Sequence, residues 1–151
     1  MTDPERRLAP VVRVAPAKLN LTLAVVGRRD DGFHALHSVV VPLGLADRLS
    51  LALRAGAGDP AGAGAATAAG DSLHVTGFDP GPVGDNLVLR AIAATRAAVT
   101  RTWPGAPAQP PGLAARLDKR IPVTAGLGGG SSDAAAAIGA ALEAWGAAPS
   151  D

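Results

Sequence analysis

Apolar and polar residues alternate along much of the first half of the chain. Between Leu19 and Val25 every second side chain is a leucine or valine, and the residues between them are Asn20, Thr22 and Ala24. This period of two is typical of a half-buried strand. On this basis we predict strands over Val11–Val14, Lys18–Val26, Ser38–Leu43, Arg48–Leu53, Ser72–Thr76 and Leu113–Leu117, with a tight turn at Asp31-Gly32.

Two alanine-rich segments are predicted to be helices. The first covers Leu87–Thr100 and is preceded by Asp85 and Asn86, either of which can serve as its N-cap. The second covers Ser131–Trp145 and begins with two serines, one of which is expected to cap it. Runs of strands with interspersed helices favour an α+β fold.

Two segments are predicted to be neither strand nor helix. Residues 55–70 are of low complexity and are predicted to form a mobile loop, and the proline-rich segment Trp103–Pro111 is predicted to be a surface connection. The 151 residues are enough to bury the core of one domain, residues 1–151, but not of two.

The composition argues against several classes of function. A formal net charge of +1 gives no electrostatic case for binding nucleic acid or a membrane surface. The chain has no cysteine, which excludes disulfides and thiolate metal sites and is compatible with a cytoplasmic protein. Its start, MTDPERRLAP, is charged and contains prolines, unlike an export signal, and no apolar run reaches membrane-spanning length.

The segment with the clearest chemistry is PVTAGLGGGSSDAA, Pro122–Ala135. Four glycines fall within the five positions 126–130, and two serine hydroxyls and a predicted helix follow. Glycines let the backbone adopt positive φ and approach a ligand closely, and a helix N-terminus attracts anions. We interpret the segment as a phosphate-binding loop. A flexible linker that ends in an N-cap is the simpler alternative.

Two common phosphate motifs do not fit this loop. A Walker loop requires Lys immediately before the Ser/Thr, where this chain has Gly130. A dinucleotide-binding G-x-G-x-x-G that starts at Gly126 would have Ser131 in its last glycine position, and no buried strand leads directly into it. The loop therefore needs a cation from elsewhere, either Mg²⁺ or a distant Lys.

Lys18 is the candidate for that distant cation. It lies two residues before Asn20 on a predicted strand, so both side chains project to the same side. The chain contains 12 Arg but only two Lys, which suggests that this position requires a compact ammonium group. A solvated Lys at a strand edge is the alternative. Phe33 and His34, just after the turn, are candidates for ligand binding or simply for packing.

Four segments together resemble a known enzyme family. Ala15–Leu21 (APAKLNL), Gly27–His34 (GRRDDGFH), Asp85–Leu87 (DNL) and Ile121–Ala135 are similar, in order and at family-like spacing, to the N-terminal part of the 4-diphosphocytidyl-2-C-methyl-D-erythritol kinase family. This family is a branch of the galactokinase, homoserine kinase, mevalonate kinase and phosphomevalonate kinase superfamily. The glycine loop alone indicates the superfamily, whereas PAKLNL followed by DGFH indicates the branch.

The resemblance implies a fold, a reaction and a set of site residues. The fold would be the ribosomal protein S5 domain 2-like fold, and the reaction would be ATP-dependent phosphorylation of the 2-hydroxyl of 4-diphosphocytidyl-2-C-methyl-D-erythritol in the non-mevalonate route to isoprenoids. Lys18 would be catalytic, Asn20, Phe33 and His34 would bind this small-molecule substrate, and Ser131 or Ser132 would lie near Mg²⁺. The ATP phosphates would be bound by Pro122, Val123, Thr124, Ala125, Gly126, Leu127, Gly128, Gly129, Gly130, Ser131 and Ser132.

The sequence also departs from the family pattern. Phe33 stands where relatives commonly have Tyr, and the Gly-Ala-Asp segment that carries the family's catalytic aspartate is absent. Asp151 follows Pro-Ser and is not assigned that role, nor is Asp133. We therefore expect a truncated N-terminal domain that is catalytically incomplete. A sibling kinase acting on homoserine or a mevalonate-type alcohol and a non-catalytic nucleotide-binding fragment stay as alternatives.

Overall fold

The computed structural model describes residues 9–54, 67, 69–82, 85–103 and 109–147. Its elements are β1 (Val11–Arg28), β2 (His34–Leu53), β3 (Ser72–Gly77), α1 (Leu87–Thr102), β4 (Leu113–Lys119) and α2 (Gly129–Ala144). The sheet has the strand order β1-β2-β4-β3, in which β3 and β4 are parallel and the other pairs are antiparallel. This mixed sheet with two helices confirms the predicted α+β class.

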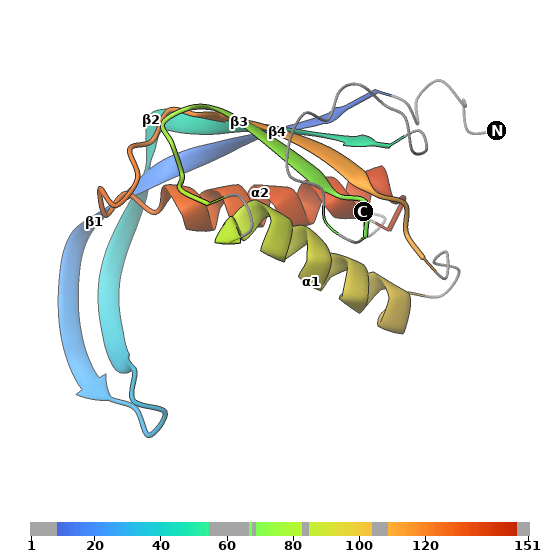
Figure 1. Cartoon of the computed structure of the whole chain (residues 1–151). Helices are drawn as coiled ribbons and strands as arrows, with labels where there is room; N and C mark the ends of the chain where they lie inside the picture. Colours follow the sequence, from blue (N-terminus) through green and yellow to red (C-terminus); the bar gives the residue numbers. More distant parts are fainter. Residues whose placement is uncertain (1–8, 55–66, 68, 83–84, 104–108, 148–151) are drawn as a thin grey trace.

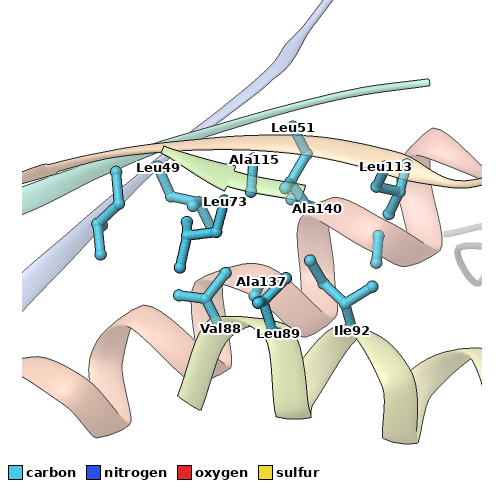
Figure 2. Close-up of a cluster of buried hydrophobic side chains, with 12 residues drawn as sticks. Leu49, Leu51, Leu73, Val88, Leu89, Ile92, Leu113, Ala115, Ala137 and Ala140 are labelled. Carbon is cyan, nitrogen blue, oxygen red and sulfur yellow. The ribbon is translucent and has the colours of Figure 1, made fainter. Parts of the chain in front are cut away.

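Both helices lie against the same face of the sheet (Figure 1). Figure 2 shows the core, which lies between the sheet and the two helices. Leu49, Leu51 and Leu73 of the sheet face the helices there. The helices contribute Val88 and Ile92 of α1 and the alanines of α2. The side chains that α2 buries beneath the sheet are mostly alanine, so this helix can approach the strands closely. The other face of the sheet has no helix against it in the part of the chain that the structure describes.

The two long strands differ from the prediction. The segments predicted separately as Val11–Val14 and Lys18–Val26 form one strand, and those predicted as Ser38–Leu43 and Arg48–Leu53 form another. The pairing of β1 with β2 contains irregularities, one of them next to Pro16. Such irregularities accommodate extra residues without ending a strand, so the residues between the predicted strands do not interrupt the pairing. Pro16 is tolerated because β1 is an edge strand.

Beyond the four-stranded part, β1 and β2 continue as a two-stranded hairpin that curves away from the helices (Figure 1). The predicted turn is confirmed: Gly32 has φ +86° and donates its N–H to the carbonyl of Arg29 at 3.0 Å. Leu21, Leu23 and Val25 on this hairpin are more than half exposed.

The helix boundaries bring one correction. At α1, Asn86 is the N-cap, and its Oδ1 accepts the N–H of Val88 at 2.9 Å. The predicted serine cap of α2 is wrong, because the helix begins two residues earlier and Gly128 is its N-cap, with φ +71°. A left-handed residue at 128 starts the helix before the serines, which therefore lie inside its first turn.

Two predicted segments fall mainly outside the described residues. Of the loop 55–70 only residues 67, 69 and 70 are described, and residues 104–108 of the proline-rich connection are likewise not described. None of the described helices is both long and apolar enough to span a membrane.

Candidate functional site

A hollow of about 330 Å³ lies between the glycine loop and the N-terminus of α1. Its lining comes from residues 122–128, 130 and 131 together with Pro80, Asp85, Asn86, Leu87 and Lys119. The predicted phosphate-binding segment therefore forms a large part of one wall, and Gly129 and Ser132 are its members that do not line the hollow. The DNL segment that carried part of the family resemblance lies across the same hollow.

The loop backbone turns repeatedly into the left-handed region. Thr124, Gly126 and Gly128 have φ values of +62°, +73° and +71°. Such turns are how successive backbone N–H groups come to face one concavity. A linker would have no reason to hold three such turns within five residues, and the left-handed conformation of Thr124 is disfavoured for a non-glycine residue.

The start of α2 adds to this anion-binding character. Its N-cap, Gly128, has no side chain to cap the helix, and no acidic residue lies in the first turn. The first intrahelical bond of this turn runs from the N–H of Ser132 to the carbonyl of Gly128 at 3.0 Å. The N–H groups of Gly129, Gly130 and Ser131 precede it and have no intrahelical acceptor, so they and the helix dipole are available to an anion.

Lys18 joins β1 to this loop. Its backbone N–H donates to the carbonyl of Leu127 at 2.8 Å, and its Nζ donates to Oδ1 of Asn20 at 2.8 Å. Both side chains are half-buried on the same side of β1. The structure thus brings Lys18 and Asn20 together beside the glycine loop, and the alternative of a solvated Lys at a strand edge does not describe this contact.

Lys119, the second of the two lysines, was not among the site residues predicted from the sequence. It ends β4, lines the hollow and is only 5% exposed. Its Nζ donates to a carboxylate oxygen of Asp47 and, at 2.8 Å, to Oδ2 of Asp133. The scarcity of lysine that drew attention to Lys18 was a signal for Lys119 too, since every lysine of the chain lies at this site.

Asp47, Lys119 and Asp133 form one buried charge cluster, which we call the Lys119 triad. Oδ1 of Asp47 also accepts the backbone N–H groups of Arg120 and Ile121, at 2.5 and 2.8 Å. Oδ1 of Asp133 is buried and has no hydrogen-bond partner among the described residues. The triad therefore joins β2, the end of β4 and the start of α2.

The two carboxyl groups of the triad have opposite pKa shifts. Burial raises the pKa of Asp133 to about 6, although hydrogen bonding and charge from Lys119 oppose this rise. Burial also acts to raise the pKa of Asp47, but hydrogen bonds from Lys119, Ile121 and Arg120 outweigh it, so this pKa is lowered. Burial acts to lower the pKa of Lys119, and the two carboxylates together raise it.

At three successive glycines of the loop, a side chain would come close to atoms of a neighbouring residue. A Cβ atom on Gly128 would lie 2.9 Å from Cγ of Lys18, and one on Gly129 would lie 2.9 Å from Nζ of Lys119. A Cβ on Gly130 would lie 3.3 Å from Cδ1 of Leu87. Glycines 128 and 129 thus let the two lysines approach the start of α2 closely.

Phe33 and His34 lie elsewhere. They are at the turn of the β1–β2 hairpin, which extends away from the helices (Figure 1). Phe33 is 71% exposed. The structure places them on the same hairpin as Lys18 and Asn20 but not beside the glycine loop. Among the described residues, no three His, Asp or Glu side chains gather where they could hold a metal ion.

Comparison with known proteins connects this geometry to a family. Residues 86–151 match the family described as "GHMP kinases N terminal domain". The 4-diphosphocytidyl-2-C-methyl-D-erythritol kinase of Paramagnetospirillum magneticum is 44% identical over 139 residues, covering 89% of this chain and 40% of that protein. The kinase of the same name from Gluconacetobacter diazotrophicus is 45% identical over 149 residues, covering 96% of this chain and 44% of that protein.

Solved structures agree with the sequence matches. A crystal structure of 4-(cytidine 5'-diphospho)-2C-methyl-D-erythritol kinase superposes with a TM-score of 0.63 at 37% identity, covering 93% of this chain and 42% of that one. Mevalonate pyrophosphate decarboxylase from Streptococcus pyogenes, at 12% identity and a TM-score of 0.58, shares the fold. The chain spans about two fifths of the length of these relatives. Residues 86–151 therefore form a GHMP kinase N-terminal domain, and the chain corresponds to the N-terminal portion of relatives that are 4-diphosphocytidyl-2-C-methyl-D-erythritol kinases.

Proposed function

We propose that this chain is the ATP-binding domain, residues 1–151, of a kinase that phosphorylates the 2-hydroxyl of 4-diphosphocytidyl-2-C-methyl-D-erythritol, a step of cytoplasmic isoprenoid synthesis. The observation that carries the proposal is the hydrogen bond from the backbone N–H of Lys18 to the carbonyl of Leu127. It holds the residue that we assign to the acceptor hydroxyl against the loop that we assign to phosphate. A phosphoryl transfer site requires this juxtaposition.

The glycine loop and the start of α2 are assigned to the ATP phosphates. The left-handed turns at Thr124, Gly126 and Gly128 and the uncapped N-terminus of α2 offer N–H donors. Because backbone donors are held in place by the fold, they stabilise charge without reorganising during the reaction. The segment 122–132 is thus the phosphate-binding element in this proposal.

Mg²⁺ fits this site as a partner of the phosphates rather than of a protein cage. The described residues hold no cluster of three metal-binding side chains, and Mg²⁺ is often bound through few protein groups together with substrate phosphates. The hydroxyls of Ser131 and Ser132, in the first turn of α2, are the groups assigned to it. Bound there, Mg²⁺ would neutralise charge on the transferring phosphoryl group.

Lys18 is assigned to the acceptor hydroxyl. Its ammonium group would hold the hydroxyl oxygen and stabilise the negative charge that develops on it. Asn20 accepts a hydrogen bond from this ammonium at 2.8 Å, which restricts the rotamers of a long side chain and orients it. Asn20 would also contact the acceptor from the same face of β1.

Phe33 and His34 are assigned to the cytidine part of the substrate. They lie on the hairpin that also carries Lys18, and Phe33 offers an exposed ring for stacking. The DGFH motif to which they belong is the feature that favours this substrate over homoserine or a mevalonate-type alcohol. The names of the relatives support the same choice.

Calorimetry on the purified chain tests the assignment of ligands. We expect binding of MgATP and of 4-diphosphocytidyl-2-C-methyl-D-erythritol, and none of homoserine or mevalonate. Binding of homoserine or mevalonate, without binding of the cytidine compound, would indicate a sibling kinase instead of the proposed one. Binding of MgATP alone would leave only a nucleotide-binding domain.

A chimera tests the reaction itself, since the chain corresponds to about two fifths of its relatives. In it, this chain replaces the matching 139 residues of the Paramagnetospirillum magneticum enzyme. We expect ATP-dependent phosphorylation of the cytidine substrate, and its loss in Lys18→Met with MgATP binding retained. Equal turnover with and without Lys18 would remove this residue from catalysis.

A further inference from the structure

We propose that the Lys119 triad is a positioning device that holds the glycine loop in its phosphate-binding conformation from both of its ends. The inference rests on the proposed function, because the loop is assigned to ATP there. It adds Asp47, Lys119 and Asp133 to the residues on which phosphate binding depends, although none of the three is expected to touch the ligand.

The hydrogen bonds reach both ends of the loop. On the N-terminal side, Asp47 accepts the backbone N–H groups of Arg120 and Ile121, immediately before Pro122. On the C-terminal side, Nζ of Lys119 donates to Asp133, which lies in the second turn of α2. Lys119 also donates to Asp47, so one ammonium links the two anchoring points. The loop between them is thereby closed over a buried charge cluster.

The position of Gly129 shows how closely the cluster follows the loop. A Cβ on this residue would lie 2.9 Å from Nζ of Lys119 and 3.0 Å from Cγ2 of Ile121. The ammonium group therefore lies against the backbone of the first helical residue. A small displacement of Lys119 would move, or be moved by, the N–H groups that we assign to phosphate.

A direct phosphate contact by Lys119 fits the structure less well. Its ammonium group already donates to two carboxylates, and the side chain is 5% exposed. Two negative charges compensate its positive charge, so the triad supplies little net attraction for an anion. The uncapped N-terminus of α2 is better placed for that role.

Stability alone is a weak reason for such a cluster. Buried ion networks can often be replaced by apolar residues of similar volume without loss of stability, because desolvation offsets most of the attraction between the charges. Apolar side chains would not provide the directional hydrogen bonds that the triad makes to two backbone N–H groups and to Asp133 of α2. The geometry thus points to position rather than stability as the consequence of the triad.

Asp133 offers the cleanest test, because its removal leaves Lys119 paired with Asp47. Asp133→Leu cuts the bond to α2, whereas Asp133→Asn keeps an oxygen that can accept from Lys119. Arg120→Met is the matched control: it removes a neighbouring positive charge, but Arg120 is exposed and its side chain forms a hydrogen bond and an ion pair with Asp118 rather than with the triad. Lys119→Met is avoided because it would leave two buried carboxylates without the positive charge that compensates them.

Three measurements are made on each variant: the thermal unfolding midpoint, hydrogen exchange of the amides of residues 123–130, and the affinity for MgATP and for inorganic triphosphate. For Asp133→Leu we expect faster exchange confined to the loop and an affinity lower by ~10- to 100-fold for both ligands, since the loss of one hydrogen bond to a charged phosphate has an effect of this size. Asp133→Asn and Arg120→Met should resemble the wild type.

The outcomes separate the two proposals. Folded Asp133→Leu with wild-type loop exchange and wild-type affinity would overturn the positioning role, and so would equal loss in the Asn and Leu variants. If the wild type does not bind MgATP, the proposed function fails, but the exchange data still decide whether the triad orders the loop. If Asp133→Leu does not fold, wild-type loop exchange in a variant with Asp133→Ala would overturn the role.

Discussion

Cγ of Lys18 lies where a side chain on Gly128 would have to be: a Cβ built on this glycine would be 2.9 Å from it. The two residues are 110 positions apart in the chain, and the N–H of Lys18 bonds the carbonyl of Leu127 beside them. Glycine at 128 therefore serves two purposes. It permits φ +71° at the start of α2, and it leaves room for the lysine that we assign to the acceptor hydroxyl.

Gly128→Val is expected to abolish MgATP binding. The side chain would displace Lys18 and strain a left-handed residue at the same time. Gly126 is the matched position for strain, since its φ is +73° but a Cβ added to it would have no described heavy atom within 4 Å beyond its chain neighbours. In urea unfolding, Gly126→Ala should cost about 1–2 kcal/mol from strain, and Gly128→Ala should cost about 1–3 kcal/mol more from crowding. Equal MgATP affinity of wild type and Gly128→Val by calorimetry would refute the expectation.

Gly129→Ala should destabilise the protein although the residue is helical. Alanine normally stabilises a helix over glycine by about 0.5–1 kcal/mol. Here the added methyl group would meet Nζ of Lys119 at 2.9 Å and Cγ2 of Ile121 at 3.0 Å. Gly139, on the same helix, has open space at this position and is the control. The sign of the change in unfolding free energy should be opposite in the two variants, and stabilisation in both would show that the triad readily moves.

His34→Ala should weaken the binding of the cytidine substrate and leave MgATP affinity nearly unchanged. The expected loss is about 1–3 kcal/mol, as for one buried hydrogen bond to the ligand. His37 lies on the same hairpin, paired with Ala24, and His37→Ala is the control for effects on the hairpin itself. Equal weakening of both ligands by His34→Ala would indicate a folding effect instead of a substrate contact.

The stability of the protein should fall in acid through Asp47. Its folded pKa is lowered, so its carboxylate contributes stability that is present above its unfolded pKa of about 3.8 and is lost as pH falls through the folded pKa. Asp47→Asn should cost about 1.5–3 kcal/mol near pH 7, because it weakens the hydrogen bonds that the carboxylate accepts from Lys119, Arg120 and Ile121. The difference from wild type should shrink below about pH 4. Urea unfolding from pH 3 to pH 8 measures this, and a difference independent of pH would contradict the assigned pKa.

Local sequence patterns were sufficient to predict the features that depend on near neighbours. The period of two located the strands, Asp31-Gly32 located the hairpin turn, and the side shared by Lys18 and Asn20 followed from their spacing. These features hold because strand geometry and turn chemistry act over a few residues. The glycine-rich loop was recognised for the same reason, since its composition is a local property.

The contacts between residues that are distant in the sequence became known only from the folded chain. Asp47 and Lys119 are 72 positions apart, and they meet because the antiparallel register pairs Arg48 with Asp118 at the adjoining positions. No local pattern reveals this register, because it depends on how whole strands pair and on the core that they bury together. The start of α2 at Gly129 rather than at the serines was also missed, because it depends on the left-handed conformation that Gly128 adopts in the folded loop.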